Sequence, residues 1–386
     1  MRLKIVLAVL VTLAATNCTT PAAPPPVPTT ISAKPKLPKL DVAAEAAWTS
    51  DGTSEARLRD GTALAVGQKT FQVIDLASGA VRWKTDENTG LGGGRWDTRV
   101  GTPFLVGEGA NLAVLSAYYR FGQDNEYGLV LLSAMDGRVL WQKTTGEHLF
   151  LHAADERIAL VTTTEVATLT KPADLRMIAF ETRTGNQLWE RTGAWPAAIA
   201  GNTVLGVNGL EQDLPLDALG PGPSVFAFDV ATGDPRWDIA DRYEGSEVLL
   251  TAGEVVLVRG TESTEDKAEL VLLSAGTGKR VVDIGEVTAN CETDGEATIV
   301  CGSEDDTLSV FRLADQSVTS VPNDDVVEAV WRDRIFVNAI GDRHYTVDLA
   351  GNEIDRIPGA PVAVSGDYLV VHENPRRPAL VGYPLG

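Results

Sequence analysis

Cysteine and histidine, the residues that most often bind transition metals or act as nucleophiles, are scarce in this sequence. The 386 residues include three Cys and four His. A zinc site needs three or four such ligands close together. His148 and His152 have a spacing that would place both on one face of a helix, but they lie in a strand-forming segment, where four residues span about 13 Å. We therefore expect no metal site there.

Acidic and glycine-rich segments give no stronger signal for catalysis. The run Glu304-Asp305-Asp306 and the pair Asp324-Asp325 lack the interleaved glycine and the final bidentate Glu of a calcium loop, and solvated turns explain them. The glycine-rich segment 90–96 does not open a helix after a strand, as a phosphate-binding loop does. We predict no catalytic residue and no resident cofactor.

Two of the cysteines have a structural explanation. Cys291 and Cys301 lie on either side of Asp294-Gly295, a pair of residues typical of a hairpin turn. A disulfide between them would staple two neighbouring strands and contribute ~2–3 kcal/mol by restricting the unfolded chain. A redox role is the alternative. Pairing these two thiols leaves Cys18 as the odd cysteine.

The N-terminus has the features of an export signal. Arg2 and Lys4 precede an apolar run over residues 5–15, which is too short for the ~20 residues of a spanning helix. Residues 13–18 resemble the lipobox of bacterial lipoproteins, although Asn17 replaces the usual small residue. The resemblance implies that residues 1–18 are a signal and that Cys18 is lipidated, which would anchor the protein on the outer side of the cell membrane. The alternative is an ordinary cleaved signal and a secreted soluble protein.

Residues 19–40 are proline-rich and cannot build a core. Extended polyproline geometry gives these residues a reach of roughly 70 Å, at about 3.1 Å per residue. We interpret them as a tether between the membrane and a domain that covers residues 41–386.

Composition restricts the partners of that domain. The formal charge is −20 and the isoelectric point is near 4.6, which argues against nucleic acid and against adhesion to anionic headgroups. Contact with the membrane is therefore expected only through a lipid anchor. Hydrophobic residues make up 44% of the chain and charged residues 22%, a balance typical of a chain with a large core.

A repeated pattern predicts the architecture of residues 41–386. Short strand-like runs are followed by a turn glycine and, four residues later, by tryptophan; the four clear pairs are Gly79 with Trp83, Gly137 with Trp141, Gly185 with Trp189, and Gly233 with Trp237. Four weaker copies follow and give eight in all, about 43 residues apart, which is the period of a four-stranded propeller blade. The sequence therefore predicts an all-β fold, an eight-bladed β-propeller of four-stranded antiparallel blades.

The last copy ends the chain without its outer strand. Trp48 precedes the first blade, at a place where the Trp of a copy would fall. We predict that this N-terminal segment supplies the missing strand and closes the ring, which would remove an exposed edge. A short helix or a disordered lead-in is the alternative.

The repeats resemble the PQQ-repeat family of β-propellers, whose blades carry an Ala-x-Asp-x-x-Thr-Gly-x-x-x-Trp pattern. This pattern is complete in residues 227–237, and in residues 179–189 Glu181 replaces the Asp. The family includes quinoprotein dehydrogenases, which stack PQQ on a disulfide between adjacent cysteines; Cys291 and Cys301 do not fit that pattern. The chain also resembles the propeller lipoprotein of the outer-membrane barrel-assembly machine, which implies a scaffold for partner proteins.

Two connections of the second blade, residues 86–99 and 118–128, are long and rich in aromatic residues and arginine, which dominate binding hot spots. In a propeller, these D-to-A and B-to-C connections emerge on the same face. The candidate binding residues are Arg95, Trp96, Tyr119, Arg120, Phe121 and Tyr127. The alternative is that these side chains only cap the propeller.

These observations predict a monomeric, exported, non-catalytic propeller that binds an envelope protein or a small ligand. A PQQ-dependent oxidoreductase and an envelope sensor for a small ligand are the alternatives. The sequence identifies no partner.

Overall fold

The structure is a computed structural model, and it describes most of the chain from residue 37 onward. The chain divides into two units, Met1–Leu37 and Pro38–Gly386, and nearly all of the described residues belong to the second. Outside the described residues lie 1–36, 38, 41, 44, 86–99, 121–125, 146, 165–174, 209–223, 263–267, 286–289, 303–305, 324, 340–342, 373–378 and 386. The predicted signal, Cys18 and nearly all of the tether therefore fall outside them. Among the described residues, no helix is long and apolar enough to cross a membrane.

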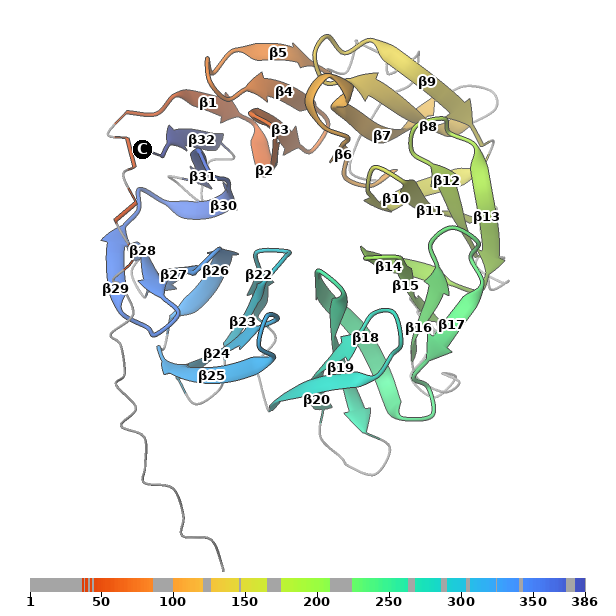
Figure 1. Ribbon diagram of the computed structural model, residues 1–386. Coiled ribbons are helices and arrows are strands. Elements are labelled where there is room, and N and C mark those ends of the chain that lie inside the picture. The colour runs from red at the N-terminus through yellow and green to blue at the C-terminus, as the bar shows by residue number, and fades with distance from the viewer. Residues whose placement is uncertain are drawn as a thin grey trace, which may run out of the picture. The chain divides into compact units, whose positions relative to one another are not determined.

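Eight four-stranded antiparallel sheets make up Pro38–Gly386, so the predicted eight-bladed β-propeller is confirmed (Figure 1). Consecutive sheets contact each other, and the first also contacts the last, so the ring is closed. We number the sheets as blades 1 to 8 and call their strands A to D from the axis outward.

The strands of blades 1 to 4 follow the chain without a crossover. Blade 1 contains β2 (Thr53–Arg59), β3 (Thr62–Gly67), β4 (Phe71–Asp75) and β5 (Val81–Lys84). Blade 2 contains β6 (Phe104–Val106), β7 (Ala113–Arg120), β8 (Glu126–Ser133) and β9 (Val139–Thr144). Blade 3 contains β10 (His148–Ala154), β11 (Ile158–Thr164), β12 (Arg176–Glu181) and β13 (Gln187–Thr192). Blade 4 contains β14 (Trp195–Ala200), β15 (Thr203–Asn208), β16 (Ser224–Asp229) and β17 (Pro235–Asp238).

Blades 5 to 7 repeat this order, and blade 8 departs from it. Blade 5 contains β18 (Tyr243–Ala252), β19 (Val255–Glu262), β20 (Ala268–Ser274) and β21 (Arg280–Gly285). Blade 6 contains β22 (Cys291–Thr293), β23 (Thr298–Gly302), β24 (Thr307–Arg312) and β25 (Ser317–Pro322). Blade 7 contains β26 (Val326–Trp331), β27 (Arg334–Ala339), β28 (Arg343–Asp348) and β29 (Glu353–Arg356). Blade 8 contains β30 (Ala360–Val364), β31 (Tyr368–His372), β32 (Ala379–Pro384) and, as strand D, β1 (Trp48–Asp51).

Strands B and C form the core because neighbouring blades cover both faces of each sheet. Every residue of β3 is buried, whereas β5 at the outer edge is mostly exposed or half-buried. Strands buried on both faces are apolar at nearly every position instead of alternating. This explains why the sequence shows short apolar runs rather than period-2 patterns.

The N-terminal segment closes the ring as predicted, and the helix or disordered lead-in is wrong. Strand β1 pairs antiparallel with β32, with Trp48 opposite Gly382 and Asp51 opposite Ala379. Just before β1, the backbone N–H of Ala43 donates to Pro384 O at 3.0 Å, and that of Ala47 donates to Gly382 O at 2.8 Å. The last blade is therefore completed by residues more than 300 positions away in sequence.

A tryptophan on strand D joins each of blades 1 to 4 to the next blade. The indole Nε1–H donates to a backbone carbonyl there; the pairs are Trp83 with Ala134 O (3.1 Å), Trp141 with Thr182 O (3.0 Å), Trp189 with Val230 O (3.0 Å) and Trp237 with Ala275 O (2.8 Å). Trp189 is 6% exposed, and the other three rings are half-buried.

In blades 2 to 5, the turn glycine lies against the tryptophan of the preceding blade. A Cβ on Gly233 would come within 2.6 Å of the Trp189 ring, and one on Gly185 within 2.8 Å of Trp141. Both glycines also have φ near +70°, which disfavours other residues. The Gly and the Trp of one copy therefore serve two different joints of the ring.

Trp48 lies at the joint between blades 8 and 1, where it packs in one buried cluster with Ala63 and Ile74 of blade 1, but its indole contacts differ from those of the other tryptophans. Its ring lies over Gly382 within its own blade, where a Cβ on Gly382 would be 2.2 Å from the indole. Its Nε1 is buried and has no hydrogen-bond partner among the described residues. The backbone carbonyl of Ala47 and the Cβ of Trp48 both face Gly79 of blade 1, at 2.5 and 3.1 Å from a Cβ placed on that glycine.

Candidate binding cleft

The predicted binding residues of blade 2 are only partly visible. Arg95, Trp96 and Phe121 lie outside the described residues. Tyr119, Arg120 and Tyr127 belong to β7 and β8, which remain paired up to Arg120 and Glu126. Residues 118–128 are therefore mostly a β-ladder rather than the loop that we predicted.

The described members of this set make contacts within the fold. Tyr119 is only 9% exposed, so its place on an exposed binding surface was predicted wrongly. Arg120 Nη1 donates to Glu126 Oε2 at 2.8 Å across the ladder. The Tyr127 ring packs on His148 with 4.7 Å between centroids. These contacts favour the capping interpretation for this part of the surface.

The histidines of β10 are packing residues in this structure. His152 Nε2 lies 2.9 Å from Thr162 Oγ1, and its ring packs edge-on against Trp195 at 4.8 Å. Burial lowers the pKa of His152 from 6.5 to about 4, so this ring is neutral at pH 7. Among the described residues, no group of three or more His, Cys, Asp or Glu side chains could hold a metal ion.

Cys291 and Cys301 form a disulfide between β22 and β23, strands A and B of blade 6. Glu292, which follows Cys291 in the sequence, lies on β22, the innermost strand of the blade. Burial raises the pKa of Glu292 from 4.5 to about 7. The disulfide links two paired strands ten residues apart, so it does not provide the bond between adjacent cysteines on which quinoprotein dehydrogenases stack their quinone.

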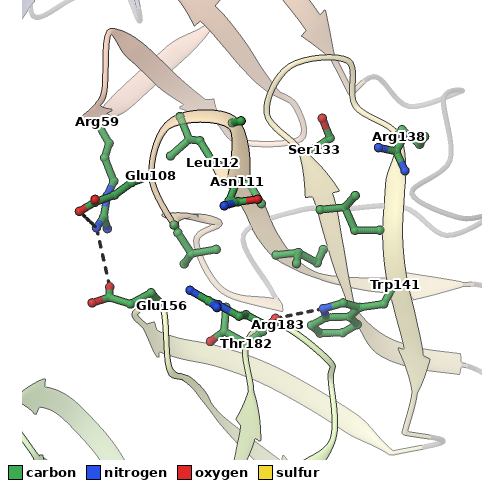
Figure 2. A pocket seen from close by; sticks show the side chains of 16 residues that line it. Arg59, Glu108, Asn111, Leu112, Ser133, Arg138, Trp141, Glu156, Thr182 and Arg183 are labelled. Atoms are coloured by element: carbon green, nitrogen blue, oxygen red, sulfur yellow. Dashed lines mark hydrogen bonds and ion pairs between the residues drawn. The ribbon is translucent and has the colours of Figure 1, made fainter.

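A cleft of about 810 Å³ is lined by residues of blades 1, 2 and 3 (Figure 2). Its walls come from A-to-B turns and C-to-D turns, which emerge together on one face of a propeller. Arg59 ends β2 of blade 1, residues 107–112 form the A-to-B turn of blade 2, and Arg183 lies in the C-to-D turn of blade 3. Three blades therefore contribute to one hollow.

Backbone contacts hold these turns in place. The short 3₁₀ turn Gly109–Asn111 is tied to blade 1, because the N–H of Gly109 donates to Asp60 Oδ2 at 2.9 Å. Next to Arg183, Thr182 Oγ1 donates to Asp155 O at 2.8 Å, and Thr182 O accepts from the Trp141 indole. The tryptophan that joins blades 2 and 3 thus also forms one wall of the cleft (Figure 2).

The arginines of the cleft differ in the carboxylates that they contact. Arg59 Nη2 lies 3.6 Å from Glu108 and 3.7 Å from Glu156, so two carboxylates more than neutralise its charge. Arg138 has only an exposed contact of 3.8 Å to Asp136. Arg183 is exposed, and its guanidinium has no partner within the described part of the chain. Arg138 and Arg183 therefore remain available to an anionic ligand.

Exposed apolar side chains lie on the outer strands and turns of the same three blades. The large hydrophobic residues with the greatest exposure on blades 1 to 3 are Val81 (49%), Met135 (57%), Val139 (40%), Leu140 (44%) and Leu188 (43%). All five lie on strands D or on a C-to-D turn, and Leu140 lines the cleft itself. Arg82 Nη1 contacts Met135 Sδ at 3.6 Å, which connects this apolar rim between blades 1 and 2.

The sequence matches the protein family described as "Outer membrane protein assembly factor BamB" over residues 67–318, well over half of the chain. The chain belongs to this family. Membership of the BamB family confirms the resemblance to PQQ-repeat propellers that the repeats indicated. A comparison with curated proteins finds no matching sequence.

Solved structures with the same fold are distant in sequence. BamB from Moraxella catarrhalis is 14% identical, with 87% of this chain and 95% of that chain covered and a TM-score of 0.49. Quinohemoprotein alcohol dehydrogenase from Comamonas testosteroni is 12% identical, with coverages of 89% and 76% and a TM-score of 0.50. The computationally designed protein Ika8 is 11% identical, with coverages of 88% and 100% and a TM-score of 0.51. At these identities the likeness shows the fold alone.

The sequence analysis missed the cleft because its residues are far apart in the chain. Arg59 ends a strand, and Arg138 and Arg183 lie in C-to-D turns, so the three belong to three separate repeats. A usable signal was present, because Arg138 and Arg183 both lie within two residues of a docking glycine.

Proposed function

We propose that this protein is a non-catalytic scaffold that binds another protein of the cell envelope. Membership of the BamB family carries this proposal, since that family is described as an outer membrane protein assembly factor. The cleft between blades 1, 2 and 3 gives the proposal a place, because it combines exposed apolar side chains with two available arginines. Aromatic residues and arginine are enriched in protein–protein interfaces and their hot spots, and the cleft presents both, as Trp141 and the two arginines.

The proposal includes export and lipidation. The apolar run over residues 5–15 and the lipobox-like end at Cys18 support an anchor on the outer side of the cell membrane, and residues 19–40 would then act as a tether. A Cys18→Ser variant should lose incorporation of an alkyne-labelled palmitate and should move from the membrane fraction to the soluble fraction. If the wild-type chain incorporates no lipid, this part of the proposal is wrong.

A PQQ-dependent oxidoreductase is the second candidate, and only the fold that it shares with quinoproteins favours it. The cysteines of this chain do not fit the quinone site of that class, because Cys291 pairs with a residue ten positions away. Adding PQQ and Ca²⁺ to the purified protein tests this candidate. A characteristic quinoprotein absorbance would favour the enzyme over the scaffold.

Site-specific photo-cross-linking tests the scaffold directly. A benzoylphenylalanine at Leu140 should cross-link to a discrete envelope protein in intact cells. Val318 on β25 of blade 6 is the matched control, since it is also an exposed apolar residue of a strand D, at 37% exposure against 44% for Leu140. Adducts at residue 140 but not at 318 would support a scaffold that binds at this cleft. If purified full-length protein also retains no envelope protein in chemical cross-linking, the scaffold proposal fails.

A further inference from the structure

The charges of the cleft contrast with those of the whole chain. A protein with a formal charge of −20 presents Arg59, Arg138 and Arg183 around one hollow, against the two carboxylates Glu108 and Glu156. Both of these carboxylates are engaged by Arg59. Arg138 and Arg183 lie on two sides of the cleft, with the Trp141 ring between them (Figure 2). Three arginines and two glutamates give the lining a net charge of +1, and Asp136, which is not among the lining residues, lies 3.8 Å from Arg138.

The apolar rim lies beside the same arginines in sequence and in space. Arg138 is followed by Val139 and Leu140 on β9, and Leu140 lines the cleft with Trp141. A ligand that reaches both arginines must also cover this apolar surface. Burial of apolar area supplies affinity, while the guanidinium groups select for carboxylates.

The other candidate occupants do not match these charges. The tether carries Lys34, Lys36 and Lys39, so it would be repelled rather than bound. An anionic membrane surface is disfavoured by the overall charge of −20. A segment of a partner protein that combines acidic and apolar residues satisfies both the arginines and the rim.

We propose that the cleft between blades 1, 2 and 3 binds an extended acidic and apolar segment of an envelope protein, with its carboxylates on Arg138 and Arg183 and its apolar side chains against Leu140 and Trp141. This inference rests on the proposed scaffold function and specifies its partner chemistry. Fork-shaped guanidinium groups can each hold a carboxylate through two hydrogen bonds, which favours a segment with acidic residues at fixed spacing.

Peptide binding tests the charge selection. The probe is a fluorescein-labelled octapeptide in which Glu alternates with Leu, and its counterpart carries Lys in place of Glu. Anisotropy with the full chain should show binding of the acidic peptide, at least tenfold tighter than binding of the basic one. In an R138E/R183E variant the acidic peptide should bind at least tenfold more weakly, and the basic peptide should bind more tightly than it does to wild type. The milder R138Q/R183Q variant should also bind the acidic peptide more weakly than wild type does.

A matched control comes from the opposite side of the ring. Arg356 is an exposed arginine of strand D in blade 7 (Figure 1), and R356E should leave the dissociation constant within twofold of wild type. All variants should have the same melting temperature as wild type, because the side chains of Arg138, Arg183 and Arg356 are exposed. Equal binding of both peptides by wild type, or equal loss in R356E, would overturn the inference.

Envelope cross-linking separates this inference from the scaffold proposal. If the wild-type chain captures a partner and R138E/R183E captures it equally well, the acidic-segment inference is wrong and the scaffold proposal stands. If neither chain captures a protein, the scaffold proposal is wrong whatever the peptides do. If the wild-type chain instead forms a dimer that R138E/R183E dissolves, the occupant is a second copy and the inference is also wrong.

Discussion

The two halves of the ring are held together by different devices. From blade 1 to blade 5, each joint repeats the same contact, an indole that packs on a glycine and donates to a carbonyl of the next blade. Between blades 6 and 7, the smaller side chain of Val321 meets Gly351 in this role, at 2.5 Å from a Cβ placed on that glycine. The joint survives the loss of the repeat because only the apolar contact is needed to exclude water.

The described residues of the second half contain other kinds of link. Blade 6 has its disulfide, and blade 8 borrows β1. On blade 7, the Asp355 carboxylate accepts from the backbone N–H of Leu40 at 2.7 Å and lies 3.9 Å from Arg334 Nη1. The N-terminal segment is thereby tied to two blades. Blades 7 and 8 therefore depend on contacts with a distant part of the chain, whereas the joints from blade 1 to blade 5 follow a repeated local pattern.

Deletion of residues 41–52 should have the largest effect, because it removes the link that closes the second half. The deletion loses the burial of Trp48, which is 5% exposed, and leaves β32 as an open edge. We expect the free energy of unfolding to fall by at least ~3–5 kcal/mol, the usual cost of losing a buried large aromatic side chain. Guanidinium denaturation measures it, with deletion of residues 19–36 as the control. Equal stability of the two deletions would contradict a structural role for β1.

The indole joints of the first half should differ in strength according to burial. Trp189→Ala should cost ~3–5 kcal/mol, because its ring is 6% exposed and its Nε1 bonds Val230 O at 3.0 Å. Trp83→Ala should cost less, since that ring is half-buried. Urea denaturation of both variants compares them. If Trp83→Ala proves the more destabilising, burial does not set the strength of these joints.

The first half could be predicted from sequence more completely than the second. The spacing of Gly and Trp identifies the C-to-D turns, because a left-handed turn and a close indole both require glycine. The closure by Trp48 was predictable as well, but not the direction of its ring. That ring turns inward because Gly382 of β32 leaves space opposite it, and the register of two strands more than 300 residues apart is not contained in a local pattern.

The candidate site was less predictable than the fold for a related reason. Tyr119 lies in what reads as a loop, yet the hairpin of β7 and β8 continues past it and blade packing buries it. Arg59, Arg138 and Arg183 come together only because turns of three consecutive blades meet on one face. Convergence of this kind depends on the curvature of the ring, which the repeat period does not specify.

Two half-buried titratable groups, one in each half, should make stability depend on pH in opposite directions. Glu292 has a pKa of about 7 in the fold, above its ordinary 4.5, so its ionisation opposes folding and stability falls as pH rises between these values. His152 has a pKa of about 4, below its ordinary 6.5, so stability falls as pH drops through that window. Each group alone contributes a slope of at most about 1.4 kcal/mol per pH unit.

Single substitutions should separate these two slopes. Between pH 4.5 and 6.5, the stability of Glu292→Gln relative to wild type should increase as pH rises, and that of His152→Gln relative to wild type should increase as pH drops. Urea denaturation at pH 4.5, 5.5 and 6.5 measures both differences. Parallel changes in the two variants would mean that burial of these groups is not the cause.

The smallest expected effect concerns a turn of the second half that has lost its glycine. Gln316 occupies the position of Gly79 in its repeat and keeps a left-handed φ of 52°, which costs an ordinary residue about 1–2 kcal/mol. Gln316→Gly removes this strain but loosens the unfolded chain by roughly 0.5–1 kcal/mol, so we expect a net stabilisation of about 0.5–1 kcal/mol. Gln187→Gly, in a strand of blade 3, is the control and should destabilise. If Gln316→Gly destabilises the protein to the same extent as this control, the Gln316 side chain stabilises the turn of blade 6, and the left-handed backbone of Gln316 carries no measurable strain.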